Sequence, residues 1–376
     1  MTAEAAAAAT AARPVDRDPV LPRPAPGSLD ELLAQSGQVA LQLSGAGQSA
    51  WNGQVIETTG SILGLAHWDG TLYLDRECIL DPLQQMYEHA GETQSIPTLV
   101  HYREALATVL HEHAHFLGPA GASQDTARKA FTQPGSRQLE EGVAEAWAQD
   151  HLDDYLTRLG VDKVAPGIKD VQAGGYYAAF VPAVRRISAD LEARNNLHSG
   201  QVIDVLNRET AAGQVPRLAS LVYNSTRLPD LEPIGADTSH HLESILREGL
   251  AHLDTFEVHP SGYAAAKSHT TAGELLQHLH HEAQSAESAH VSHPAACAVP
   301  PPSPVTPARL TSSAPAQAQT RLAPPPHQTA LSGISPPRPH LPATPAPAAT
   351  GDVPASQVWK PGSRGAHPAS VENAAR

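Results

Sequence analysis

Proline is concentrated near the C-terminal end of this chain, and this distribution limits which residues can fold. Of the 34 prolines among 376 residues, 19 fall in the final 83. Such a segment cannot bury enough apolar surface to offset the entropy lost on ordering, and it favours polyproline II or coil. We therefore expect a disordered Pro/Ala-rich tail at residues 294–376, a mostly disordered Ala/Pro-rich segment at residues 1–44, and the folded protein between them.

The charge of the chain is unevenly distributed and argues against one class of partner. The formal net charge is −14, and the tail, with six basic and two acidic residues, contributes +4 and leaves −18 for the rest. With this charge, residues 1–293 would repel the phosphate backbone of a nucleic acid. The sequence also has no stripe of Lys and Arg with interleaved aromatic residues. We therefore expect no nucleic-acid partner.

The number of cysteines and the composition of the N-terminal segment indicate the cellular compartment of the protein. Cys78 and Cys297 are the two cysteines. They are too few for a disulfide framework or a cysteine zinc site, and such usage suits a reducing compartment. The alanine-rich N-terminus has no basic region of the kind that opens a secretory signal, and no apolar stretch approaches the length of a transmembrane helix. We expect a cytoplasmic protein with no membrane partner.

The apolar periodicity predicts an α+β, mainly helical domain over residues 45–256, with a small N-terminal hairpin. Strands are expected at 61–67 and 71–75, because they flank Asp69-Gly70, a strong hairpin turn signal. Ser28 is expected to cap a short helix that begins at Leu29. The other expected helices cover residues 97–117, 138–159, 175–195, 200–212 and 239–256, with a His-rich helical extension at 257–293 that holds a helix over 272–288.

The run His111-Glu112-His113-Ala114-His115 satisfies the pattern H-E-x-x-H inside the helix expected at 97–117. Residues four apart lie one turn apart on the same face of a helix, so His111 and His115 can bind one ion. Glu112 lies beside them. Zinc lowers the pKa of a bound water to about 7, so Glu112 could take its proton and later pass it to a leaving amine. His113 projects onto the apolar stripe and is expected to be a packed core histidine.

A third ligand is needed, and the next expected helix offers candidates. It contains Glu140, Glu141 and Glu145. A glutamate from a second helix packed against the first would complete a three-ligand zinc site. Glu140 and Glu141 compete for this role. Glu145 could instead hydrogen-bond the free ring N–H of a ligand histidine, or it could be an ordinary solvated carboxylate.

H-E-x-x-H followed by Glu141-Gly-Val-Ala-Glu145 resembles the gluzincin branch of the zinc metallopeptidases, over roughly residues 51–177. The resemblance implies a zincin-like fold, with Zn²⁺ held by His111, His115 and Glu141 and with Glu112 as general base and acid. It also implies that the edge strand of the small sheet receives an extended peptide. In such sites a later Tyr or His stabilises the oxyanion, and here Tyr176 and Tyr177 are candidates between which the sequence does not choose.

The sequence departs from that family in two respects. His115 and Glu141 are separated by 25 residues, a longer spacing than in the best-known members, which indicates an insertion between the two helices. The related metzincin branch matches at Gly118, but Gly121 stands where that branch has its third ligand. The metzincin assignment is therefore disfavoured.

We expect a zinc-dependent metallopeptidase whose partner is a peptide or protein substrate. The alternative is a non-catalytic module in which zinc fixes two helices while the proline-rich tail recruits a partner. A fourth protein ligand at the ion would favour that alternative, because structural zinc sites are closed by four protein ligands. The remaining histidines are expected to be solvated side chains, although a secondary metal-buffering patch is the competing interpretation; they are His240, His241, His278, His280 and His281.

Overall fold

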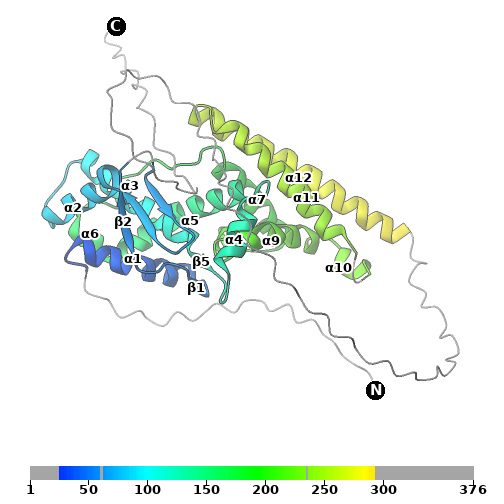
Figure 1. Cartoon of the computed structure of the whole chain (residues 1–376). Helices are drawn as coiled ribbons and strands as arrows, with labels where there is room; N and C mark the ends of the chain where they lie inside the picture. Colours follow the sequence, from blue (N-terminus) through cyan, green and yellow to red (C-terminus); the bar gives the residue numbers. More distant parts are fainter. Residues whose placement is uncertain (1–24, 60–61, 234–235, 293–376) are drawn as a thin grey trace, which may run out of the picture.

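The structure is a computed structural model of the chain, and it describes residues 25–59, 62–233 and 236–292 (Figure 1). The tail expected at residues 294–376, the partner expected for it, and residues 1–24 of the N-terminal segment expected to be mostly disordered lie outside the described residues. Within the described residues the fold is α+β and mainly helical, as expected. The helices are α1 (Leu29–Ser44), α2 (Asp81–Glu88), α3 (Ile96–His115), α4 (Gln124–Phe131), α5 (Ser136–Leu159), α6 (Val161–Val164), α7 (Val181–Arg194), α8 (Gln201–Leu206), α9 (Ala211–Asn224), α10 (Leu228–Leu231), α11 (Thr238–Ala251) and α12 (Ser261–Ser292), with a π-helical turn η1 (Arg76–Leu80) and a 3-10 turn η2 (His252–Phe256).

The expected hairpin is present and forms part of a three-stranded sheet. Strand β3 (Gly64–Ala66) pairs antiparallel with β4 (Leu72–Asp75), and Gly70 in the turn has a φ of +89°, which glycine adopts without strain. Strand β2 (Val55–Thr58) pairs parallel with the other side of β4, so the order is β2-β4-β3 and β3 is an edge strand. The sequence analysis did not predict β2.

A second, smaller sheet joins the N-terminal segment to the end of α3. Strand β1 (Gln48–Ser49) pairs antiparallel with β5 (Leu117–Gly118), and the Ala50 N–H donates to the carbonyl of Phe116 at 2.7 Å. Helix α3 therefore ends at His115, two residues earlier than expected, because residues 117 and 118 pair as a strand instead.

Helices α1, α3 and α5 pack against one another, and the first two begin at a serine that caps the helix. Ser28 caps α1 by accepting a hydrogen bond from the Glu31 N–H, which confirms the expected cap. Ser95 caps α3 in the same way, and Pro97 lies in its first turn. Helix α1 packs against α3 and α5, so the folded part begins sixteen residues before the expected domain boundary at residue 45.

The later helices differ from expectation where the sequence holds turns or a proline. Helix α7 begins at Val181 rather than at residue 175, because residues 175–180 form a turn in which Tyr177 has a φ of +53°. The helix expected at 200–212 is divided into α8 and α9, and α9 continues through Pro216 to Asn224. Helix α12 packs against α7 and α11 along one edge of the molecule, so it continues the helical body (Figure 1).

Candidate metal centre

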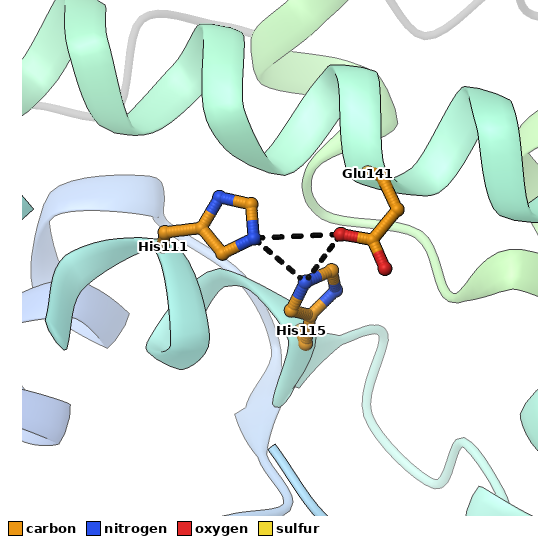
Figure 2. A group of neighbouring side chains, drawn as sticks. All are labelled: His111, His115 and Glu141. Carbon is orange, nitrogen blue, oxygen red and sulfur yellow. Dashed lines mark hydrogen bonds and ion pairs between the residues drawn. The ribbon is translucent and has the colours of Figure 1, made fainter. Parts of the chain in front are cut away.

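Helices α3 and α5 pack against each other and bring three side chains together (Figure 2). Nε2 of His111 lies 3.1 Å from Nε2 of His115. Oε2 of Glu141, from α5, lies 3.5 Å from the first of these nitrogens and 3.4 Å from the second. All three groups are buried or nearly so, and within the described ranges no other three His, Cys, Asp or Glu side chains converge in this way.

The donor set fits a divalent cation such as Zn²⁺. Two imidazole nitrogens and one carboxylate oxygen are three of the four ligands that zinc prefers, and three protein ligands are typical of a site that keeps an open position. Oε2 of Glu141 is buried, and its neighbours are the two Nε2 atoms at 3.4 and 3.5 Å, which are long contacts for hydrogen bonds. A cation between the carboxylate and the two imidazoles would satisfy this buried oxygen more fully.

The other ring nitrogen of each histidine faces a second carboxylate. Oε2 of Glu145 lies 3.0 Å from Nδ1 of His111, and Oε1 of Glu140 lies 3.2 Å from Nδ1 of His115. Both carboxylates can fix their histidine with Nδ1 protonated and Nε2 directed at the cation. Glu141, rather than Glu140, thus faces the two Nε2 atoms, and Glu145 contacts Nδ1 of His111, as expected of a histidine-orienting group.

These contacts shift the proton affinities of the cluster. Burial opposes protonation of His111, but hydrogen bonds to Glu141 and Glu145 outweigh burial and raise its pKa to about 9. Burial likewise opposes ionisation of Glu141, but the neighbouring charge of His115 and hydrogen bonds from both histidines hold its pKa below the ordinary value. The carboxylate of Glu141 therefore stays ionised, which is the state in which it binds a metal.

Glu112 lies on α3 between the ligand histidines and is fully buried. Its Oε2 accepts a hydrogen bond from the Ala66 N–H of β3 at 2.8 Å, whereas its Oε1 is buried without a hydrogen-bond partner. Burial raises the pKa of Glu112, so this carboxyl binds a proton more readily than an exposed glutamate does. The edge strand β3 thus holds Oε2 of Glu112, whereas Oε1 is open to a hydrogen bond from a bound molecule such as water.

Gly64 on β3 makes room for this carboxylate. A Cβ atom at residue 64 would lie 2.6 Å from Cγ of Glu112 and 2.7 Å from its Oε1, well inside contact distance. Any larger residue would therefore displace Glu112. No local pattern in the sequence marks Gly64 or Ala66, because their contact with Glu112 depends on the approach of β3 to α3.

The structure separates the two candidate tyrosines. The ring of Tyr177 stacks on His111, with centroids 5.5 Å apart, and its side chain hydrogen-bonds to Glu141. Tyr176 is turned away: its side chain hydrogen-bonds to Thr108, and only its backbone N–H reaches the cluster, donating to Oε1 of Glu145 at 2.9 Å. Tyr177 therefore lies at the metal centre, whereas Tyr176 supports Glu145.

Arg137 is a further charged group at the centre that the sequence analysis did not identify. It lies one turn before Glu141 on α5, and helical spacing from Glu141 could have indicated it. Its guanidinium lies 5.3 Å from the ring centroid of Phe180 and pairs with Glu257 at 2.8 Å. Burial raises the pKa of Tyr177, and the negative charges of Glu141 and Glu112 raise it further. The positive charge of Arg137 opposes this increase.

His113 lies on the face of α3 away from His111 and His115. It is buried, and its Nε2 lies 2.6 Å from Oγ of Ser36, which confirms a packed core histidine. Gly142 on α5 makes room for α7, because a Cβ there would lie 2.6 Å from Cγ2 of Val184.

The later histidines do not form a second metal group among the described residues. Nε2 of His280 pairs with Asp190 at 2.7 Å, and His241 and His278 both lie near Glu282, at 3.4 and 3.8 Å. His241 and His278 are exposed, as expected, whereas the side chain of His280 is only 13% exposed and departs from the solvated interpretation.

No family model, no curated protein and no solved structure matches this chain. Among the described residues, none of the helices combines the length and the apolar character needed to cross a membrane.

Proposed function

We propose that this protein is a zinc-dependent metallopeptidase with a zincin-like fold. The observation that supports this most is the convergence of His111, His115 and Glu141 beside a buried Glu112 oxygen that has no hydrogen-bond partner. A bound Zn²⁺ would act as a Lewis acid on a peptide carbonyl and make a water molecule more acidic. This chemistry requires a base next to the cation, and Glu112 is in that position.

Each remaining group has a role in this reaction. Glu112 takes a proton from the attacking water through Oε1 while the Ala66 N–H holds its Oε2. The water oxygen bonds to the carbonyl carbon, and the C–N bond then breaks as the same carboxyl returns the proton to the leaving amine. Tyr177, with its pKa raised by burial and by Glu141, stays protonated and can donate to the oxygen that gains negative charge.

The alternative, a structural zinc in a binding module, requires a fourth protein ligand. Glu140 is one candidate for that ligand, but its Oε1 lies at Nδ1 of His115, on the other side of the imidazole from Nε2. Among the described residues the convergent group has three members. This arrangement supports a site with an open position, and hence the hydrolase.

The test is cleavage of a mixed peptide library by the zinc-loaded protein, with Glu112→Gln beside the wild type. We expect products from the wild type and at least about a 100-fold slower reaction for Glu112→Gln, with zinc bound one to one in both. Glu248→Gln is the control, because Glu248 is exposed on α11 in a second Glu-Gly-x-Ala run. Equal cleavage by Glu112→Gln, or none by the zinc-loaded wild type, would refute the proposal.

A further inference from the structure

A small cavity lies next to the metal centre, on the side of His115. Its walls include His115 and Glu140 from the centre, Ala66 at the end of β3, and the rings of Trp68, Phe116 and Phe131. Its volume is about 10 Å³, which is close to the space that a single water molecule requires. The cavity is therefore large enough for a methyl-sized group and too small for a branched or aromatic side chain.

The cavity shares residues with both parts of the proposed catalytic apparatus. His115 supplies a metal-facing nitrogen, and the Ala66 N–H holds the carboxylate of Glu112. A peptide bond placed between the cation and Glu112 would therefore have a neighbouring side chain within reach of this cavity. Glu140 lines it as well, and its buried carboxylate disfavours an acidic side chain there.

The aromatic walls set the size of the cavity. The rings of Trp68 and Phe131 meet edge to face, with centroids 5.6 Å apart. Phe116 and Phe131 are both buried, at 2% and 8% exposure, so neither ring can swing out without unpacking its own surroundings. A larger guest would have to displace a packed ring, which is unfavourable.

We propose that this cavity is a specificity subsite that receives the side chain of one residue flanking the cleaved bond and restricts it to small uncharged residues such as Gly, Ala or Ser. This inference rests on the proposed peptidase function and names its substrate class. Phe131, whose side chain lies on α4, is the residue that limits the size of the subsite. Each added methylene should lower kcat/KM by roughly 10-fold or more, because it must displace a packed aromatic ring.

The test is product sequencing after the zinc-loaded protein cleaves a mixed peptide library, for the wild type and for Phe131→Ala. For the wild type we expect one of the two positions flanking the cleaved bond to contain small residues only. For Phe131→Ala we expect that same position, and no other, to accept Leu and Met with at least about a 10-fold higher kcat/KM. Phe131→Leu keeps an apolar side chain on α4 and should increase cleavage beside Leu and Met by a smaller factor. This variant also tests the subsite if Phe131→Ala does not fold.

Phe256→Ala is the matched control, because Phe256 is buried to a similar extent, at 9% exposure, but does not line the cavity. It should leave the preference unchanged. The inference alone is wrong if the wild type cleaves beside large residues as readily as beside small ones, or if neither Phe131 variant changes the preference. If the wild type cleaves no peptide, the proposed function fails and the subsite fails with it.

Discussion

Oε1 of Glu140 lies 3.2 Å from Nδ1 of His115, so this carboxylate meets the imidazole on the side away from the metal-facing Nε2. Glu145 has the same relation to His111, at 3.0 Å. Each ligand histidine of the candidate centre is therefore held by its own carboxylate from α5, and Glu141, between them in sequence, is left to face the cation. One helix thus supplies both the third ligand and the two groups that orient the others.

The first prediction concerns the different roles of adjacent glutamates. Glu140→Gln should weaken zinc binding by about 10- to 100-fold, because it removes a group that orients a ligand, whereas Glu141→Gln should weaken it more, because it removes a ligand. Competition with a chromogenic chelator measures both affinities. Glu145→Gln should behave like Glu140→Gln. A larger loss for Glu140→Gln than for Glu141→Gln would reverse the assignment.

The second prediction separates the two tyrosines. Tyr177→Phe should keep zinc and lower kcat by about 100- to 1000-fold, because it removes one donor to the developing negative charge. Tyr176→Phe should remain close to wild type, since its hydroxyl contacts Thr108 rather than the metal centre. Steady-state kinetics on one cleaved peptide gives both values. Equal losses in the two variants would contradict the assignment of Tyr177.

The third prediction tests the space that β3 leaves for Glu112. Gly64→Ala should lower kcat by at least about 10-fold with zinc still bound, because a Cβ would meet the Glu112 side chain at 2.6 Å and misplace the base. Gly262→Ala is the control, because no atom lies within 4 Å of a Cβ at that position. Unchanged turnover in Gly64→Ala would show that Glu112 does not need its present position.

The fourth prediction concerns the opposite side of α3, where Ser36 and His113 meet. Ser36→Ala should lower the free energy of unfolding by about 1–3 kcal/mol, because it leaves the Nε2 of a buried histidine without a partner. Adding His113→Leu to this variant should recover part of the loss, since both polar partners are then removed. Urea denaturation of the two single variants and the double variant measures the coupling. Additive losses would show that the pair does not interact.

The fifth prediction is a pH dependence at the β3–β4 turn. Hydrogen bonds from the His67 side chain and the Thr71 N–H lower the pKa of Asp69 from 3.8 to about 2. The ionised carboxylate therefore contributes stability above about pH 4, and this contribution is lost as the pH falls towards 2. Because Asp69 is largely exposed, Asp69→Asn should cost less than about 1 kcal/mol at pH 7, and the cost should be smaller near pH 2, where half of the carboxylates are protonated. Thermal melts of the wild type and Asp69→Asn at both pH values measure this difference. A difference that stays the same at the two pH values would contradict this origin.

Local signals predicted the elements that carry the candidate site. The hairpin at Asp69-Gly70 and helices α3 and α5 have clear turns, caps and apolar stripes, and the H-E-x-x-H run lies on α3 as expected. The pairing of β2 with β4 was not predictable in the same way, because a parallel pair is joined by a crossover and has no turn signal. Helix α7 begins late because Tyr177 adopts a positive φ, which sequence periodicity does not reveal.

The roles of neighbouring residues on α5 depend on how that helix is rotated against α3. Adjacent helical residues point about 100° apart, so either Glu140 or Glu141 could face the cation until the packing of the two helices is known. The choice of Tyr177 over Tyr176 depended on the same kind of information, since one hydroxyl meets Glu141 and the other meets Thr108. The sequence left two candidates for the third ligand and two for the oxyanion donor. The tertiary contacts favour Glu141 and Tyr177.

The central claim is that His111, His115 and Glu141 bind one zinc ion and leave a coordination position for solvent. An anomalous-difference map at the zinc absorption edge, from crystals of the zinc-loaded protein, tests this most directly. We predict one strong peak about 2.0–2.2 Å from the two Nε2 atoms and a Glu141 oxygen, with a water as the fourth ligand. A peak elsewhere, a fourth ligand from the protein, or no peak at these three residues would contradict the account.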